Sequence, residues 1–285
     1  MRLVEFTAPG RRGAGAIVPG GVLDLARAVP GAPESVVGVL AAEGAVRHAI
    51  RRATEDVDPT HVLPWPGVRL LAPVPRPGAI WCIGYNYRGH TTQDDPAFPD
   101  VFTKPAAAVV GPQDAIILPV AAAEVDYEAE LAVVIGRRAH RVAESEALDH
   151  VGGYTVLNDV SARDWQRHGS QWGLAKSFPT FAPLGPAVVT PDEIPDLADL
   201  TVEARVDGET TLRGSTRDLV FPVAWIVAYL SRAVVLEPGD VIATGTPQKL
   251  PHVLDRGPRW LRPGDVVEIT ISHVGTLRST VVAPE

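Results

Sequence analysis

Three acidic residues alternate along one short run of the chain, DYEAELAVVIG at residues 126–136. In an extended strand, side chains two positions apart point the same way, so Asp126, Glu128 and Glu130 are expected to share one face. Like charges this close repel each other unless water or a cation lies between them. A divalent cation bound by two or three carboxylates is one solution, and a solvated edge strand is the alternative.

Another acidic residue follows a second expected strand. The run YTVLNDVSARDWQ predicts a strand that ends at Asn158 and Asp159 and turns directly into a short helix. Asp159, Arg163 and Gln166 are four and three positions apart, so they are expected to form one face of that helix. In the alternative interpretation Asp159 only caps the helix, and the other two residues face solvent.

Three further polar residues lie in constrained runs. His90, a possible general base, lies in the glycine-containing run GYNYRGHTTQ, although a lone histidine is more often structural. Lys176 precedes three prolines in AKSFPTFAPLGP. Thr246 follows an expected strand in ATGTP, which lacks the lysine and the spacing of a phosphate-binding loop.

Lysine is rare in this chain. The 26 basic residues include only three lysines, Lys104, Lys176 and Lys249. Arginine stays protonated in proteins, whereas lysine carries a compact charge that its surroundings can tune. Each lysine is therefore a candidate for a position where this difference matters, with chance as the alternative.

Composition excludes several classes of protein. A net charge of −8 disfavours binding to a nucleic-acid backbone. Cys82 is the only cysteine, and Glu5 interrupts the first apolar stretch, so neither a disulfide nor a secretory signal is expected. The charge-free stretch 219–231 is shorter than the roughly 18–20 residues that cross a membrane. A cytoplasmic protein with no membrane or nucleic-acid partner is therefore expected.

The elements fall into two expected domains. Residues 1–72 combine two short strands with one helix over 36–53 and predict a small accessory α/β domain. Closely spaced prolines in LLAPVPRPG favour a boundary there, because they can continue neither a helix nor a central strand. Residues 73–285 form the expected main domain.

The main domain is expected to be β-rich, with one clear helix whose apolar residues repeat over 219–230. Its expected strands lie at 79–84, 107–111, 130–136, 154–159, 187–190, 200–208, 240–245 and 265–275. The sequence therefore predicts an α+β fold in which strands dominate.

Six motifs in order resemble the fumarylacetoacetate hydrolase superfamily over about residues 78–282. They are IGYNYRGH, VFTKP, DYEAELAVVIG, GYTVLNDVSARDWQ, AKSFPTFAPLGP and LEPGDVIATGTP, followed by LRPGDVVEITI and VGTL. The resemblance implies a mixed β-roll or sandwich catalytic domain behind a small N-terminal domain, and a homodimer. It also implies a divalent-metal-dependent enzyme that acts on a small 2-oxo acid or 1,3-dicarbonyl substrate of the acylpyruvate type.

The resemblance also assigns residues by position. It implies that Glu128, Glu130 and Asp159 bind Mg²⁺ or Mn²⁺, an ion that would stabilise an enolate. It matches Lys176 to the active-site lysine and His90 to the lid histidine. The remaining matches are to substrate contacts, namely Tyr85, Arg163, Gln166 and Thr246.

The chain departs from the family pattern at Gln93, where hydrolytic members usually have a glutamate that pairs with the lid histidine. Glutamine cannot stabilise an imidazolium by charge. Asp94 or Asp95 could replace it if the lid is shifted in register. Hydrolysis of a carbon–carbon bond is the usual reaction of the family and is the first expectation. Decarboxylation or enol–keto isomerisation is expected almost equally, and a metal-binding pseudoenzyme is a further alternative. The run GTPQKLPHVLDRGPRW, with Lys249, also departs and could reshape one pocket wall or be a variable loop.

Overall fold

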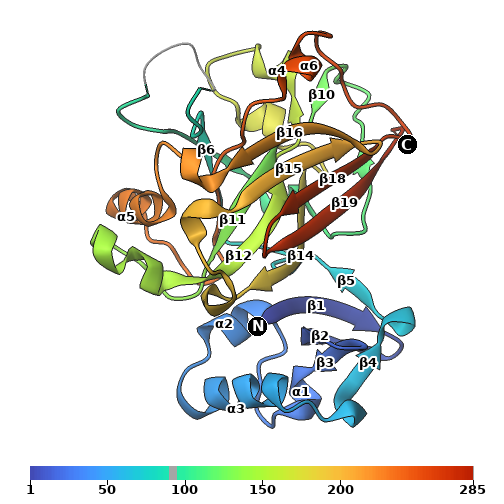
Figure 1. Ribbon diagram of the computed structural model, residues 1–285, viewed down its shortest axis with the longest axis vertical. Coiled ribbons are helices and arrows are strands. Elements are labelled where there is room, and N and C mark those ends of the chain that lie inside the picture. Colours follow the sequence, from blue (N-terminus) through green and yellow to red (C-terminus); the bar gives the residue numbers. More distant parts are fainter. Residues whose placement is uncertain (90–94, 285) are drawn as a thin grey trace.

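A computed structural model of the protein describes residues 1–89 and 95–284. Strands dominate and the helices are short, so the predicted α+β, β-rich fold is confirmed (Figure 1). The N-terminal segment lies at one end of the molecule, below the longer strands of the main part in that view. Among the described residues, no helix is long and apolar enough to span a membrane.

The largest sheet runs through both parts of the molecule. Its strands follow one another in the order β4 (Val62–Pro64), β3 (Gly21–Asp24), β2 (Arg11–Val18), β1 (Arg2–Ala8), β14 (Ala182–Val189), β12 (Val151–Asn158), β11 (Ala129–Ile135), β17 (Val241–Ala243), β6 (Ile80–Gly84) and β7 (Asp100–Lys104), with β5 (Arg69–Leu71) paired to β1 and β8 (Val109–Val110) paired to β14. The link between the parts is the antiparallel pair β1–β14, where Arg2 lies opposite Val189. The division at residues 72 and 73 stays a prediction.

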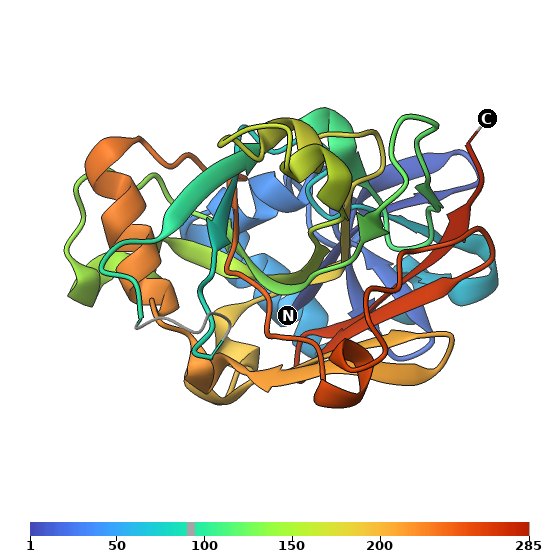
Figure 2. The same ribbon diagram turned by 90° about the horizontal axis from the view of Figure 1, so that it is seen from above.

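A second sheet faces the first. It contains β16 (Glu209–Ser215), β15 (Thr201–Val206), β18 (Val266–Ile271), β19 (Gly275–Val282) and β9 (Ile116–Ile117) in that order. A separate pair joins β10 (Val125–Asp126) to β13 (Ser161–Ala162). Seen from above, the strands of the main part form a ring (Figure 2). One buried hydrophobic cluster contains residues of both sheets, including Val133 and Ile269.

Strand β11 is buried on both faces, which explains its unbroken apolar run. Leu131 and Val133 belong to the core between the two sheets. Ala132 and Val134 belong to the cluster that also holds Leu3 of the N-terminal segment. The strand that begins just after Glu128 is therefore fixed from both sides.

The α-helices are α1 (Leu25–Ala28), α2 (Val36–Ala41), α3 (Gly44–Glu55), α4 (Arg163–Gln166), α5 (Val223–Ala233) and α6 (Pro251–Leu254). The single helix expected over 36–53 is wrong, because the chain leaves helical geometry at Ala42 and Glu43. Gly44 then begins α3 with a φ of +56°, a conformation that costs glycine least. The helix expected over 219–230 is present as α5, but it begins only at Val223, so Leu219 lies outside it.

Asn86 ties together three segments near the ends of β6 and β17. Its side chain is fully buried and donates to the carbonyl oxygens of Phe221 and Thr244, at 3.1 and 2.7 Å. Its carbonyl oxygen accepts from the Phe221 backbone N–H at 2.8 Å. The side chain therefore holds the start of α5 against the strand ends that lead into the site described below.

Asn86→Ala is expected to lower the free energy of unfolding by at least about 2 kcal/mol, because it leaves buried backbone groups without partners. Urea denaturation measures this change. Thr280→Ala on the exposed face of β19 is the control and is expected to change stability by less than about 0.5 kcal/mol. An Asn86 variant as stable as the control would contradict the assignment.

Candidate metal centre and active site

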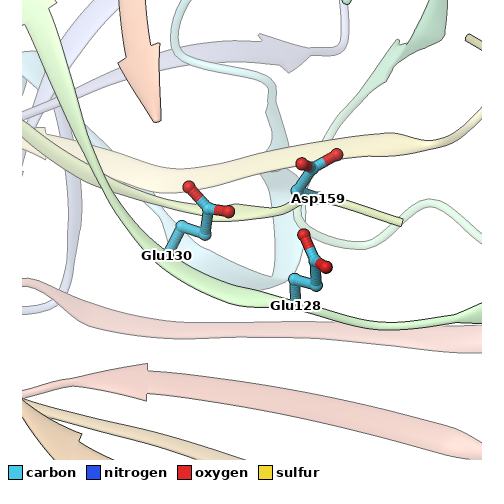
Figure 3. Close-up of side chains that lie close together, drawn as sticks. All are labelled: Glu128, Glu130 and Asp159. Atoms are coloured by element: carbon cyan, nitrogen blue, oxygen red, sulfur yellow. The ribbon is translucent and has the colours of Figure 1, made fainter. Parts of the chain in front are cut away.

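Three carboxylates gather at one point, as Figure 3 shows. Each of Glu128, Glu130 and Asp159 offers an oxygen atom, and these atoms all lie within 4.8 Å of one another. Asp159 is fully buried and Glu130 almost so, while the Glu128 side chain is 12% exposed. The acidic residues that were predicted to share a site are therefore brought together.

The pairing of β11 with β12 positions this cluster. Ala129 lies opposite Asn158, so the residues just outside the ladder, Glu128 and Asp159, are neighbours. The Asp159 backbone N–H donates to the Glu128 carbonyl oxygen at 3.0 Å. The Asn158 side chain accepts from the Glu128 N–H at 3.1 Å. Backbone hydrogen bonds thus fix both carboxylates relative to each other.

Asp159 does not lie on the helix, contrary to the prediction. Strand β13 intervenes between Asp159 and α4, because Ser161 pairs with Asp126 of β10. The residue before α4 is Ala162, so Asp159 does not cap that helix either. Asp159 instead points into the buried cluster.

Two lysines engage Asp159. Lys176 Nζ lies 2.7 Å from Asp159 Oδ2 and 2.7 Å from Glu128 Oε2. Lys104 Nζ lies 2.6 Å from Asp159 Oδ1 and donates to the Val160 carbonyl oxygen at 3.1 Å. Each oxygen of this carboxylate therefore accepts from a buried ammonium group.

The charges set the direction of the pKa shifts. Burial alone would discharge Lys176, but Asp159 and Glu128 outweigh it and raise the lysine pKa. Burial would also raise the Glu128 pKa, yet Lys176 and Arg163 lower it well below its usual range. Glu128 and Lys176 therefore remain ionised together.

The pKa of Glu130 shifts in the opposite direction to that of Glu128. Burial raises its pKa, and the nearby charges of Asp159 and Glu128 raise it further. Its one hydrogen bond comes from the Gly245 N–H, 2.7 Å from Oε2, and it forms no ion pair with any residue the structure describes. Gly245 has a φ of +97°, and an added Cβ would lie 2.9 Å from the Asn86 Cβ, so a glycine is needed there. A cation beside Glu130 would relieve its repulsion.

The donor set fits a hard divalent ion. The oxygen ligands are those that Mg²⁺ and Mn²⁺ prefer, and three protein ligands leave positions for water or substrate. Glu130 is the carboxylate of the three that has no ion-pair partner among the described residues, and a bound cation would favour its ionised form. The residues that would hold such an ion are Glu128, Glu130 and Asp159.

A second ionic group adjoins the first. Arg163 donates to Asp126 Oδ2 at 3.0–3.1 Å and to Glu128 Oε1 at 2.5 Å. Its Nη1 also donates to the Gln166 side-chain oxygen at 3.0 Å. Lys249 Nζ lies 2.5 Å from Asp126 Oδ1. The predicted pair Arg163 and Gln166 therefore meets, at the edge of the cluster.

These groups line a cavity of about 710 Å³. Of the sequence-predicted residues, Tyr85, Glu128, Glu130, Arg163, Gln166, Lys176 and Thr246 line it. Phe102 and Trp172 form an aromatic wall, with ring centroids 5.4 Å apart. Lys176 Nζ lies 5.0 Å from the centroid of the Phe102 ring. The polar groups of a small molecule could thus contact the ionic residues of the cavity, and its apolar groups could contact the aromatic wall.

The expected lid residues His90 and Gln93, with Asp94, lie outside the described residues. Asp95, the other possible replacement, forms an ion pair with Arg88 at 3.3 Å, and both side chains are about half exposed. Asp95 is therefore engaged by Arg88 rather than by the residues of the carboxylate cluster.

Lys104 belongs to the site although no specific role was predicted for it, whereas Asp126 was expected beside the two glutamates and Lys249 in a possible pocket wall. Their signals were present: Asp126 shares the face of the two glutamates, and the lysines are two of only three. All three lysines of the chain contact carboxylates of this site. Lysine scarcity was thus an informative pattern.

Fold and site together define a β-rich protein with a carboxylate cluster suited to a divalent metal, at the wall of a small-molecule cavity. The family described as "Fumarylacetoacetate (FAA) hydrolase C-terminal" matches residues 79–282. The chain belongs to the fumarylacetoacetate hydrolase family, as the motifs indicated.

Similar proteins extend over the whole chain. A bovine (Bos taurus) protein named "Oxaloacetate tautomerase FAHD2A, mitochondrial" is 43% identical over 99% of this chain and 92% of its own length. The structure of fumarylacetoacetate hydrolase from psychrophilic Exiguobacterium antarcticum matches with a TM-score of 0.84 and 36% identity over 99% of both chains. Maleylpyruvate hydrolase from Sphingobium sp. SYK-6, in complex with manganese(II) and pyruvate, matches with a TM-score of 0.83 and 30% identity over 100% of both chains.

The expectation of a cytoplasmic protein is contradicted, because several relatives of this chain, the bovine protein among them, are named as mitochondrial. Scarce cysteine indicates only a reducing compartment. The expectation considered only the apolar segment of a secretory signal, whereas a mitochondrial transit peptide is amphipathic.

Glu130→Gln is expected to weaken Mn²⁺ binding by about 100-fold or more, because it removes a ligand charge while keeping a hydrogen-bond acceptor for Gly245. Titration followed by the electron paramagnetic resonance of free Mn²⁺ measures this affinity. Glu124→Gln, whose side chain contacts Arg167 near the surface, is the control and should change affinity by less than about twofold. Equal affinities in both variants would show that the cluster is not the metal site.

Proposed function

We propose that the protein is a divalent-metal-dependent enzyme that interconverts the enol and keto forms of a 2-oxo acid, with oxaloacetate as the leading substrate. The observation that carries this proposal is the placing of Lys176 between Glu128 and Asp159, beside Glu130, at the cavity wall. The name of the bovine relative, an oxaloacetate tautomerase, supports this branch of the family's chemistry.

Each group has a separate task in this proposal. A bound Mg²⁺ or Mn²⁺ would supply Lewis acidity that favours the enolate form of a chelating 2-oxo acid. Lys176 stays charged and donates a hydrogen bond toward the oxygen on which negative charge develops. Arg163 and Gln166, already joined at 3.0 Å, contact the polar groups of the substrate, with Tyr85 and Thr246 completing the cavity wall.

Tautomerisation moves one proton between C3 and the neighbouring oxygen, so it needs no nucleophilic water. The glutamine at position 93 is compatible with this reaction, because the usual glutamate serves to activate water together with the lid histidine. His90 is the candidate proton acceptor from the sequence.

Homodimerisation also stays a prediction, implied by the resemblance to the family.

Hydrolysis of an acylpyruvate is the second candidate. It is favoured by the likeness to maleylpyruvate hydrolase, whose structure contains manganese(II) and pyruvate. Decarboxylation shares the same enolate chemistry. Three assays of the purified protein with Mg²⁺ separate these reactions: loss of enol absorbance, release of carbon dioxide and cleavage of an acylpyruvate. Addition of EDTA should abolish the reaction that occurs.

Lys176→Met is expected to lower kcat for oxaloacetate tautomerisation by about 100- to 1,000-fold, because it removes a preorganised donor to the developing negative charge. Stopped-flow loss of enol absorbance measures kcat, and circular dichroism verifies folding. A folded variant with unchanged kcat would contradict the role given to Lys176.

Gln93→Glu is expected to raise acylpyruvate hydrolysis by at least about tenfold, because a carboxylate can stabilise a protonated histidine. Tautomerisation by the same variant should change much less. Chromatographic measurement of the cleavage products tests this. If the wild-type protein already cleaves acylpyruvates faster than it tautomerises oxaloacetate, hydrolysis replaces tautomerisation as the main activity.

A further inference from the structure

The backbone of Lys249 is anchored in the cavity wall. It follows β17, and the bridge between Lys249 and Leu212 of β16 anchors its backbone. The side chain is 19% exposed, and its Nζ lies 2.5 Å from Asp126 Oδ1 and 4.5 Å from the centroid of the Tyr127 ring. A single flexible ammonium group therefore faces both the cavity and a buried carboxylate.

The ionic group around Asp126 contains two cations, Lys249 and Arg163, and two carboxylates, Asp126 and Glu128. Asp126 accepts from both Lys249 and Arg163. Arg163 also contacts Glu128, whose charge is directed to the metal in the proposed function. With a metal bound, two cations would then share the single charge of Asp126, and an anion from the substrate would restore the balance.

The other described arginines of the cavity wall are paired with acids outside the metal cluster. Arg167 contacts Glu124 at 2.7 Å. Arg259 contacts Asp207 at 2.7 Å and Asp265 at 3.1 Å. Lys249 and Arg163 instead share Asp126, and only Arg163 also contacts the metal ligand Glu128.

We propose that Lys249 is a specificity-determining residue that binds the second carboxylate of a 2-oxo dicarboxylic acid whose 2-oxo acid end faces Glu128, Glu130 and Asp159. This inference rests on the proposed function and narrows its substrate class to dicarboxylates. A compact ammonium on a flexible stem can turn from Asp126 toward the substrate, and Arg163 then keeps Asp126 paired.

The test compares oxaloacetate with 2-oxobutanoate, which has the same number of carbon atoms and a methyl group in place of the distal carboxylate. Dissociation constants come from competition with Mg²⁺-dependent oxalate binding in a calorimeter. Lys249→Met is expected to weaken oxaloacetate binding by about 10- to 100-fold and to change 2-oxobutanoate binding by less than about threefold. Lys249→Arg should retain most of the preference for oxaloacetate.

Arg167→Met is the matched control, since it removes a cavity-wall cation that is already paired with Glu124. It should leave the ratio of the two dissociation constants unchanged. Lys249→Gln replaces Lys249→Met if the latter does not fold.

The outcomes separate this inference from the proposed function. Failure of oxalate to bind wild-type protein with Mg²⁺ would overturn the proposed function itself. Oxalate binding with the same substrate preference in wild type and Lys249→Met would overturn only the role of Lys249. Loss of oxalate binding in Lys249→Met would also overturn that role, because oxalate has no distal carboxylate.

Discussion

The burial of four carboxylates beside one cavity is the constraint on which the site depends. Asp126, Glu128, Glu130 and Asp159 would repel one another strongly in a medium of low polarity. This repulsion is offset by cations and by the Gly245 N–H, which donates to Glu130. The strand pairing that places the acids also places these partners, so fold and electrostatics cannot be separated here.

The type of cation at each position suits the arrangement of the carboxylates around it. The guanidinium of Arg163 spans Asp126 and Glu128 with several donors in one plane, as a fork-shaped group can. Lys176 instead places one compact charge between two carboxylates. The cluster thereby keeps Glu130 for a metal ion while a fixed positive charge remains where an enolate oxygen would form. That division of charge supports the proposed chemistry on 2-oxo acids.

Local pattern predicted much of this arrangement. The spacing of Asp126, Glu128 and Glu130 predicted that they point the same way, and all three line the cavity, although β10 and β11 are separate strands with Glu128 between them. A strand end placed Asp159, because it too depends on neighbours in sequence. The contact between Lys104 and Asp159 joins residues 55 positions apart and depends on how β6, β7 and β12 meet, which periodicity does not encode. The helix expected directly after Asp159 begins only at Arg163, because Ser161 and Ala162 pair with β10 and this pairing overrides local helix propensity. The break of the helix expected over 36–53 likewise depends on packing of α2 against the main sheet.

The central claim is that the carboxylate cluster binds a divalent metal which in turn binds a chelating 2-oxo acid. Calorimetric titration with oxalate, with and without Mg²⁺, for wild type and Glu128→Ala tests it most directly. The account predicts that oxalate binds only when both Mg²⁺ and Glu128 are present, and that oxalate tightens Mg²⁺ binding by the same factor by which Mg²⁺ tightens oxalate binding. Oxalate binding that is independent of Mg²⁺, or an unchanged affinity in Glu128→Ala, would contradict it.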